Sequence, residues 1–251
     1  MKAEDEHVRR DAGSVRWTTY LVALVALCVL IGLGTWQVQR LHWKETLLAD
    51  IEARRTSAPM ELADVEKQFS ATHDVDYQAV RLSGAYLNDK EQFFFATWKG
   101  ETGFYVYTPL RLSDGRYIFV NRGFVPYDLK DPAKRPIEVT GPVTVVGLAR
   151  NPLSEKPSML VPENDLGGNI FYWKDIGGMA RNAGLDGVEI LPFVVDADAT
   201  PNPGGLPIGG VTLIDLPNNH LQYALTWYGL AAALVAVFGV FAWRRQKGAK
   251  P

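Results

Sequence analysis

The stretch YLVALVALCVLIGLG, residues 20–34, decides the architecture of this 251-residue chain. It lies within a longer segment, residues 17–39, that has no charged residue. A second uncharged segment, LQYALTWYGLAAALVAVFGVFAW, occupies residues 221–243. About 20 helical residues, each adding about 1.5 Å, cross the roughly 30 Å hydrocarbon core of a bilayer. We therefore predict transmembrane helices over 17–39 and 217–243, and a domain over 40–216 between them.

The first apolar segment could also be read as a secretory signal peptide, because GLG supplies small residues at its end. Two features oppose that reading. The leader, residues 1–16, is long and carries four acidic residues, and the helical pattern continues past Trp36. The acidic residues also disfavour a mitochondrial transit peptide, since such peptides are poor in acids. We expect a membrane anchor in a bacterial plasma (inner) membrane.

Basic residues near the helix ends set the expected orientation. The tail, residues 244–251, has four Lys or Arg and no acid, whereas residues 200–220 have no Lys or Arg. Basic residues that follow the first span weaken the assignment at that end. We predict a two-pass protein with a cytoplasmic leader and tail and a periplasmic central domain.

Cysteine content, charge and motifs disfavour several classes of function. The one cysteine, Cys28, lies within the first span, so the exported domain has no disulfide and no thiolate metal site. The formal net charge is −2, and no basic stripe or zinc-finger spacing points to nucleic acid. The motifs of a nucleophile elbow, a phosphate-binding loop and a zinc peptidase are also missing from the sequence. We predict that the protein is not an enzyme; a hydrolase built from acidic residues is the weaker alternative.

Between the spans the sequence changes from a helical to a strand-like pattern. Residues 40–55 keep a helical rhythm, so the first helix is expected to extend beyond the membrane. Short aromatic and β-branched runs, separated by turn signals, then predict strands over 77–87, 91–98, 103–112, 116–125, 142–150, 188–197 and 210–216. A helix is expected over 173–183 and a loop over 200–210. The predicted fold class is α+β: an antiparallel β-rich domain, barrel- or sandwich-like, flanked by two transmembrane helices.

His220 stands at the head of the second span. Asn219 is the expected N-cap and Gln222 the third helical residue, so His220 begins the helix. The helix dipole there favours the neutral imidazole, which is the form that binds metals. Tyr223 and Trp227 are expected on the same helix face. The group would suit a flat apolar macrocycle with a central iron; alternatively, His220 is an interfacial polar residue beside belt aromatics.

The first helix offers a second set of candidates at the same membrane interface. Trp36, Arg40 and Trp43 form a stripe at helical spacing. Arg40 could pair with a carboxylate such as a haem propionate, or it could be an anchor whose head reaches the interface. Gly32 and Gly34 would permit close approach of the other span.

The stretch FVNRGFVP, residues 119–126, interrupts an apolar strand with Asn121, Arg122 and Gly123. A glycine at such a place indicates a strand end or a bulge that presents the arginine. Arg122 could then pair within the domain or contact a partner.

Three segments, GTWQVQRLHWKETLL, VNRGFVP and NNHLQYALTWYGLA, resemble the Surfeit locus protein 1 family in order, spacing and position beside two spans. The resemblance covers nearly the whole chain. It implies an assembly factor of a haem–copper cytochrome c oxidase that assists haem a insertion into subunit I. It also implies that His220 is the ligand of the haem a iron, whereas Gln37 and Asn219 carry over without an assigned role.

These observations combine into two hypotheses. In the first, haem a is bound transiently at the outer membrane interface by His220, Arg40, Trp36, Tyr223 and Trp227. Its partners are subunit I, the haem a biosynthesis proteins and the lipid bilayer, and Asn121, Arg122 and Gly123 bind a partner. In the alternative, the protein is a scaffold that binds no haem and stabilises subunit I during assembly. A two-pass ligand sensor is a weaker reading, because the cytoplasmic ends are short.

Overall fold

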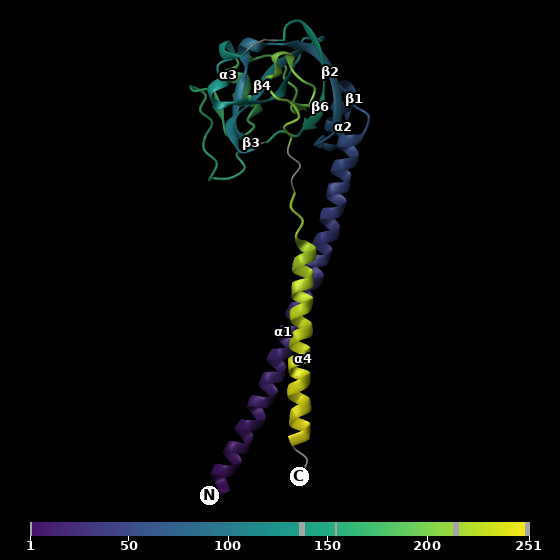
Figure 1. Ribbon diagram of the computed structural model, residues 1–251, viewed down its shortest axis with the longest axis vertical. Coiled ribbons are helices and arrows are strands. Elements are labelled where there is room, and N and C mark those ends of the chain that lie inside the picture. Colours follow the sequence, from purple (N-terminus) through teal and green to yellow (C-terminus); the bar gives the residue numbers. More distant parts are fainter. Residues whose placement is uncertain (1, 136–138, 154, 213–215, 249–251) are drawn as a thin grey trace. The chain divides into compact units, whose positions relative to one another are not determined.

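The computed structural model describes residues 2–135, 139–153, 155–212 and 216–248 (Figure 1). The chain forms two compact units. One comprises Met1–Ala49 with Asp215–Pro251, and the other comprises Asp50–Ile214. The first unit consists of two long helices, and the second is a β-rich domain. Helix α1 (Lys2–Thr56) begins in the first unit and ends in the second, which confirms that the first helix continues past the predicted span.

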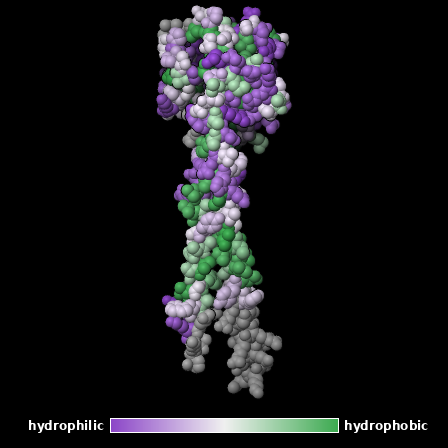
Figure 2. Space-filling view, turned by 90° about the vertical axis from the view of Figure 1, so that its right-hand side faces the viewer, coloured by the Kyte–Doolittle hydropathy of each residue, from purple (hydrophilic) through white to green (hydrophobic). Residues whose placement is uncertain are grey.

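Helices α1 and α4 (His220–Gly248) are both long and apolar enough to cross a membrane. Only 6% of the most apolar stretch of α1 and 11% of that of α4 are buried, so neither is the core helix of a soluble domain. Hydrophobic side chains cover the exposed surface of the two helices over a continuous stretch (Figure 2). The chain therefore fits a two-pass membrane protein.

One stripe of each helix is turned away from solvent. On α4 the buried and half-buried residues include His220, Ala224, Trp227, Ala231, Leu234 and Phe238. On α1 they include Ala23, Leu27, Leu30, Gly34, Gln37 and Leu41. Both stripes alternate spacings of three and four residues, which is the pattern of helices that pack at a small crossing angle. We call this contact the helix seam.

Small residues allow the close approach at the helix seam. A Cβ added to Gly34 would lie 2.7 Å from the ring of Tyr228, and the Thr35 and Tyr228 hydroxyl oxygens are 3.1 Å apart. The predicted role of Gly34 is confirmed. Gly32, in contrast, faces open space, so its predicted role in the contact is wrong.

The domain is built on a closed β-barrel, which confirms the predicted α+β class. The barrel order is β2 (Ala79–Tyr86), β6 (Pro142–Arg150), β8 (Val194–Ala197), β5 (Tyr117–Pro126) and β4 (Glu101–Leu112), and β4 pairs back with β2. Three further strands flank it: β1 (Met60–Glu61) beside β2, and β3 (Gln92–Trp98) and β7 (Ile170–Phe171) beyond β4. Most pairings are antiparallel, and β1–β2, β3–β7 and β5–β8 are parallel.

The sheet contains two antiparallel sets of strands: β2–β6–β8, and β5–β4 with the flanking strand β3. Two short contacts join the sets. Strands β2 and β4 share three residue pairs, from Gly84↔Leu112 to Tyr86↔Leu110, and β5 and β8 share two, Val120↔Val195 and Asn121↔Asp196. We call these contacts the barrel joints.

Two short helices complete the hydrophobic cores. Helix α2 (Leu62–Thr72) contributes Val65 to the core inside the barrel, and α3 (Ile176–Asn182) contributes Met179 to a second cluster with Tyr107 and Phe119. Single 3-10 turns lie at η1 (Asn88–Lys90), η2 (Tyr127–Leu129), η3 (Pro132–Lys134) and η4 (Pro203–Gly205). The helix predicted over 173–183 is thus present but shorter, because the Asp175 side chain caps it by accepting from Gly178 N.

The end of the domain departs from the prediction. Of the strand predicted over 188–197, only β8 is regular, although Ile190 makes an isolated bridge to Tyr117. The strand predicted over 210–216 is wrong for 210–212, which are irregular, whereas 213–215 lie outside the described residues. Val211 is buried there without a ladder, so an apolar run packs as a loop. The predicted loop, 200–210, contains η4 and a backbone pairing of Ile208 with Phe124.

Candidate functional site

Helix α4 begins at His220, as predicted. The backbone N–H of Tyr223 donates to the carbonyl oxygen of Asn219 at 3.2 Å, which makes Asn219 the residue that precedes the first turn. On the other side of Asn219, the Lys44 ammonium donates to the carbonyl oxygen of Pro217 at 2.7 Å. The entrance of α4 is therefore held against α1, which fixes the position of His220.

A hydrogen bond connects His220 to the other helix. Its Nδ1 lies 2.7 Å from Oε1 of Gln37, whose side chain is buried on the helix seam. Because an amide oxygen only accepts, Nδ1 is the donor in this contact, and Nε2 is the ring nitrogen that Gln37 does not use. Histidines that bind metals almost always donate their second ring N–H to such a partner, which fixes the ring. Gln37 thus fixes the orientation of the His220 ring.

Arg40 and the two tryptophans form the predicted stripe. The Arg40 guanidinium lies 5.9 Å from the ring centre of Trp36 and 5.0 Å from that of Trp43. Trp36 and Trp43 are about half exposed. The two rings hold the cation at the surface of α1, where its N–H groups can meet a carboxylate. The structure therefore brings Arg40 to Trp36, and His220 to Gln37.

Tyr223 and Trp227 lie differently from one another. Trp227 is half-buried on the helix seam with His220, whereas Tyr223 is 54% exposed. At 3.6 residues per turn, seven residues return almost to the same direction, but three residues stop about 60° short of it. Trp227 therefore shares a helix face with His220, as predicted, whereas Tyr223 lies to the side of that face.

The donor set fits a single axial ligand. Within the described ranges, no three His, Cys, Asp or Glu side chains lie close enough to hold a bare metal ion. A lone imidazole with an available Nε2 suits a metal whose other ligands come from a macrocycle. The orientation that Gln37 imposes on His220 is consistent with this use.

Asn121, Arg122 and Gly123 form a β-bulge in the middle of β5. Tyr105 pairs with Phe124 and Tyr107 with Asn121, so two residues of β5 oppose Val106 alone. The predicted bulge is confirmed, and the alternative of a strand end is wrong. Gly123 has φ +128°, and a Cβ there would lie 2.0 Å from the carbonyl oxygen of Ile208. Only glycine fits this position.

The bulge directs Arg122 to a buried carboxylate. Its Nη1 lies 3.4 Å from Oε1 of Glu91 and donates to Oδ1 of Asn88 at 3.0 Å. Arg135 also holds Glu91, with Nη1 3.2 Å from Oε1 and Nη2 on Oε2. The three charged side chains are 3–7% exposed. Arg122 therefore pairs within the domain, and its expected contact with a partner stays a prediction.

Tyr86 closes this buried cluster. The guanidinium of Arg122 lies 4.6 Å from its ring centre. Burial raises the pKa of Tyr86 to about 12, although the positive charge of Arg122 opposes the shift. The phenol is therefore neutral at physiological pH, and its ring serves as a surface on which Arg122 rests.

Comparison with known proteins shows the family to which this sequence belongs. Residues 24–232 match the model of the SURF1 family, and this range includes Gln37, His220 and the β5 bulge. The chain belongs to the SURF1 family. Surfeit locus protein 1 of Rattus norvegicus is 35% identical, over 92% of this chain and 75% of its own length. That of Homo sapiens is 34% identical over 92% and 77%, and the SURF1-like protein of Monosiga brevicollis 36% over 91% and 88%.

Family membership confirms the resemblance that the sequence motifs indicated. SURF1 proteins are known as assembly factors of cytochrome c oxidase and not as enzymes. Sequence reasoning missed the roles of Gln37, Glu91 and Arg135. The spacing of Gln37 from Gly34 and Leu41 on one helix stripe is a signal that could have found the first. The sequence carries no comparable signal for Glu91 and Arg135.

Proposed function

We propose that this SURF1 protein assists the insertion of haem a into subunit I of a haem–copper cytochrome c oxidase by binding haem a transiently. The observation that carries the proposal is the bond between His220 Nδ1 and Gln37 Oε1. It holds the imidazole of a membrane-level histidine with Nε2 available. Membership of the SURF1 family supports a role in oxidase assembly, and the bond to Gln37 supports ligation of the haem iron by His220. The protein would sit in a bacterial plasma membrane, with both termini cytoplasmic and the barrel domain periplasmic.

Each residue of the proposed site has a separate task. His220 binds the iron that haem a supplies, and Gln37 keeps its second nitrogen protonated. Arg40 pairs with a propionate carboxylate through the guanidinium edge that Trp36 and Trp43 leave accessible. Trp227 and Tyr223 offer aromatic surface to the macrocycle. A single protein ligand also suits a carrier, since release breaks only one bond to the protein.

The test is an absorption spectrum of the full-length protein purified from membranes that make haem a. Wild type should carry haem a, and His220→Ala should lose it. His42→Ala is the matched control, because His42 is an exposed histidine of α1 near the same interface, and it should keep the wild-type spectrum. Equal spectra and equal haem affinities for wild type and His220→Ala would sink the ligand assignment.

The scaffold alternative is favoured by one feature of the domain. Arg122 and Tyr86 line a small cavity of about 190 Å³ that a partner side chain could enter. A colourless wild type that still captures subunit I would select this alternative. Arg122→Lys should then weaken capture, whereas His220→Ala should not. Unchanged thermal unfolding of Arg122→Lys would show that the loss is not one of folding.

A further inference from the structure

The barrel domain contains a second candidate site that the proposed function does not use. A cavity of about 340 Å³ opens between the end of β6 and the segment that leads into α3. Two cations, Arg150 and Lys174, and one carboxylate, Asp76, line it together with apolar side chains that include Phe94, Leu153 and Tyr172. Its volume lies at the lower end of the range for small-molecule sites, about 300–1,000 Å³.

Arg150 forms a fixed cationic part of the cavity. Its Nε donates to Oδ1 of Asp76 at 3.0 Å, and its Nη1 lies 3.3 Å from Oδ2 of Asp196. The guanidinium also lies 4.3 Å from the ring centre of Tyr77. These contacts use two of five N–H donors, so others can meet a bound molecule without a change of rotamer.

Both carboxylates near Arg150 already accept hydrogen bonds. Asp196 is 3% exposed, and it accepts from Asn121 Nδ2 at 2.9 Å and from Thr212 Oγ1 at 3.0 Å, in addition to Arg150. Asp76 also accepts from the backbone N–H of Asn151 at 3.0 Å, through the same Oδ1 that Arg150 contacts. Both oxygens of Asp196 are therefore engaged, whereas Oδ2 of Asp76 makes no hydrogen bond within the described residues.

Lys174 is the second cation of the cavity, and it lacks a direct partner. Within the described ranges its ammonium makes no hydrogen bond and no ion pair. Burial lowers the pKa of Lys174, against the opposing effect of Asp196 and Asp76. Lys174 is half-buried, and the three donors of its ammonium are available to an acceptor that enters the cavity.

We propose that the cavity binds an apolar molecule that carries one carboxylate. The carboxylate pairs with Lys174 and Arg150, and the apolar body lies along the walls that Phe94, Tyr172 and Leu153 provide. A single negative charge is favoured over a doubly charged phosphate, because the nearby carboxylates of Asp76 and Asp196 would repel a second negative charge. The inference is independent of haem binding, since all of these residues belong to the barrel domain.

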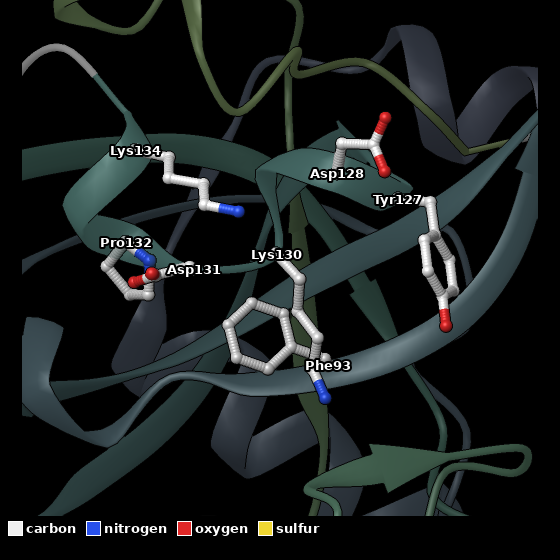
Figure 3. Close-up of a pocket in the computed structure, with 7 residues that line it drawn as sticks. All are labelled: Phe93, Tyr127, Asp128, Lys130, Asp131, Pro132 and Lys134. Atoms are coloured by element: carbon white, nitrogen blue, oxygen red, sulfur yellow. The ribbon is translucent and has the colours of Figure 1, made fainter.

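Another cavity of the domain supplies the matched control. It measures about 380 Å³ and is lined by Phe93, Tyr127 and Lys130, among others (Figure 3). One of its two lysines is satisfied internally: Lys130 Nζ donates to the carbonyl oxygen of Gly168 at 2.6 Å and lies 5.3 Å from the ring centre of Phe93, whereas Lys134 is exposed. Lys130 therefore does not require a bound anion, although it lines a cavity of similar size.

The experiment is a ligand-observed fluorine NMR titration of the full-length protein in nanodiscs. The probe is 4-(trifluoromethyl)phenylacetate, and the uncharged reference is its amide. Wild type should bind the acid at least about tenfold more tightly than the amide, a difference of about 1.4 kcal/mol. Lys174→Met should remove that preference, whereas Lys130→Met should keep it. Equal binding of acid and amide, no binding of either, or an unchanged preference in Lys174→Met would overturn the proposal.

Two sources could supply such a carboxylate, a free small acid or the end of a partner chain. Short peptides that end in Phe, with a free or an amidated C-terminus, distinguish them. Tighter binding of the free peptide than of the probe, lost in Lys174→Met, identifies a chain terminus. Binding of the probe alone identifies a small acid. Both outcomes support the carboxylate site.

Discussion

His220 Nδ1 and Gln37 Oε1 are 2.7 Å apart, although the two residues are 183 positions apart in the sequence. The bond crosses the helix seam at the N-terminal end of α4. It gives one histidine a defined tautomer and a fixed ring plane. The proposed haem site therefore depends on the pairing of the helices, and not on α4 alone.

Replacing Gln37 tests this dependence. Gln37→Leu keeps the volume of the side chain and removes the acceptor, so the imidazole loses its orientation. We expect the affinity for haem a to fall about 10- to 100-fold, the usual effect of losing the partner behind a ligating histidine. Haem titration measures it. Gln39→Leu, at an exposed amide of the same helix, is the control and should retain wild-type affinity.

The helix seam itself should be sensitive to volume at one glycine and not at its neighbour. Gly34→Leu places a side chain where Tyr228 lies, and overpacking of this kind costs about 1–3 kcal/mol. Gly32→Leu enters open space. Crosslinking of Gln37→Cys to His220→Cys with a short bifunctional maleimide, in a Cys28→Ser chain, reports the pairing. The yield of crosslinked protein should decrease for Gly34→Leu and not for Gly32→Leu. Equal yields for the two variants would contradict the packing of Gly34 at the helix seam.

Glu91 should be among the most sensitive positions of the domain. Glu91→Gln removes the buried carboxylate that Arg122 and Arg135 share. The free energy of unfolding should fall by about 3–5 kcal/mol, as for other broken buried ion pairs. Denaturant unfolding followed by tryptophan fluorescence measures it. Glu52→Gln breaks an exposed pair with Arg55 and should cost less than about 1 kcal/mol. Comparable losses for both variants would argue against the buried cluster.

Lys174 should make the stability of the domain depend on pH. Because its pKa is lowered by burial, the folded protein binds this proton less tightly than the unfolded chain, in which the lysine titrates near 10.5. Between the two pKa values the unfolded chain holds more protons, so stability rises with pH in that window.

Lys174→Met should remove that slope and, at neutral pH, raise the free energy of unfolding by about 1 kcal/mol, as is common when a functional site is relieved of an unpaired charge. Denaturant unfolding at several pH values between 7 and 10 measures both effects. Lys67→Met alters an exposed lysine paired with Asp64 and should leave the pH dependence of the free energy of unfolding unchanged. A destabilised Lys174→Met would identify the lysine as structural.

The sequence predicted the spans, the α+β class and the position of His220, because each depends on local patterns, whereas it left open whether the sheet forms a barrel or a sandwich. Uncharged runs mark the helices, period-two runs mark most strands, and Asn219 marks the start of α4. The pairing of His220 with Gln37 could not be predicted from hydrophobic periodicity, and the spacing of Gln37 from Gly34 was the one available signal. In a membrane helix, the lipid-facing side is as apolar as the packed side, so hydrophobic periodicity does not reveal which face meets the neighbour.

The domain shows the same limit for long-range contacts. A glycine after Asn121 and Arg122 was enough to indicate a strand end or a bulge, since the requirement is local, and the structure has the bulge. That Glu91 and Arg135 meet Arg122 follows from how three separate segments converge, which no spacing encodes. Val211 misled the prediction for a related reason: burial by the rest of the domain, and not strand pairing, explains its apolar character.

The two barrel joints are the places where the sheet of the domain should open most easily. Each antiparallel set of strands has long ladders inside it, whereas only three and two residue pairs join the sets. Amide protons at the joints, such as those of Ala85 and Val195, should therefore exchange with solvent sooner than those between β4 and β5, as two rigid plates part transiently. The side-chain bond from Asn121 to Asp196 fastens one joint, and the cavity of Arg150 and Phe94 takes one wall from each plate. A molecule bound in that cavity would contact both sets of strands, and it should therefore slow amide-proton exchange at both joints together.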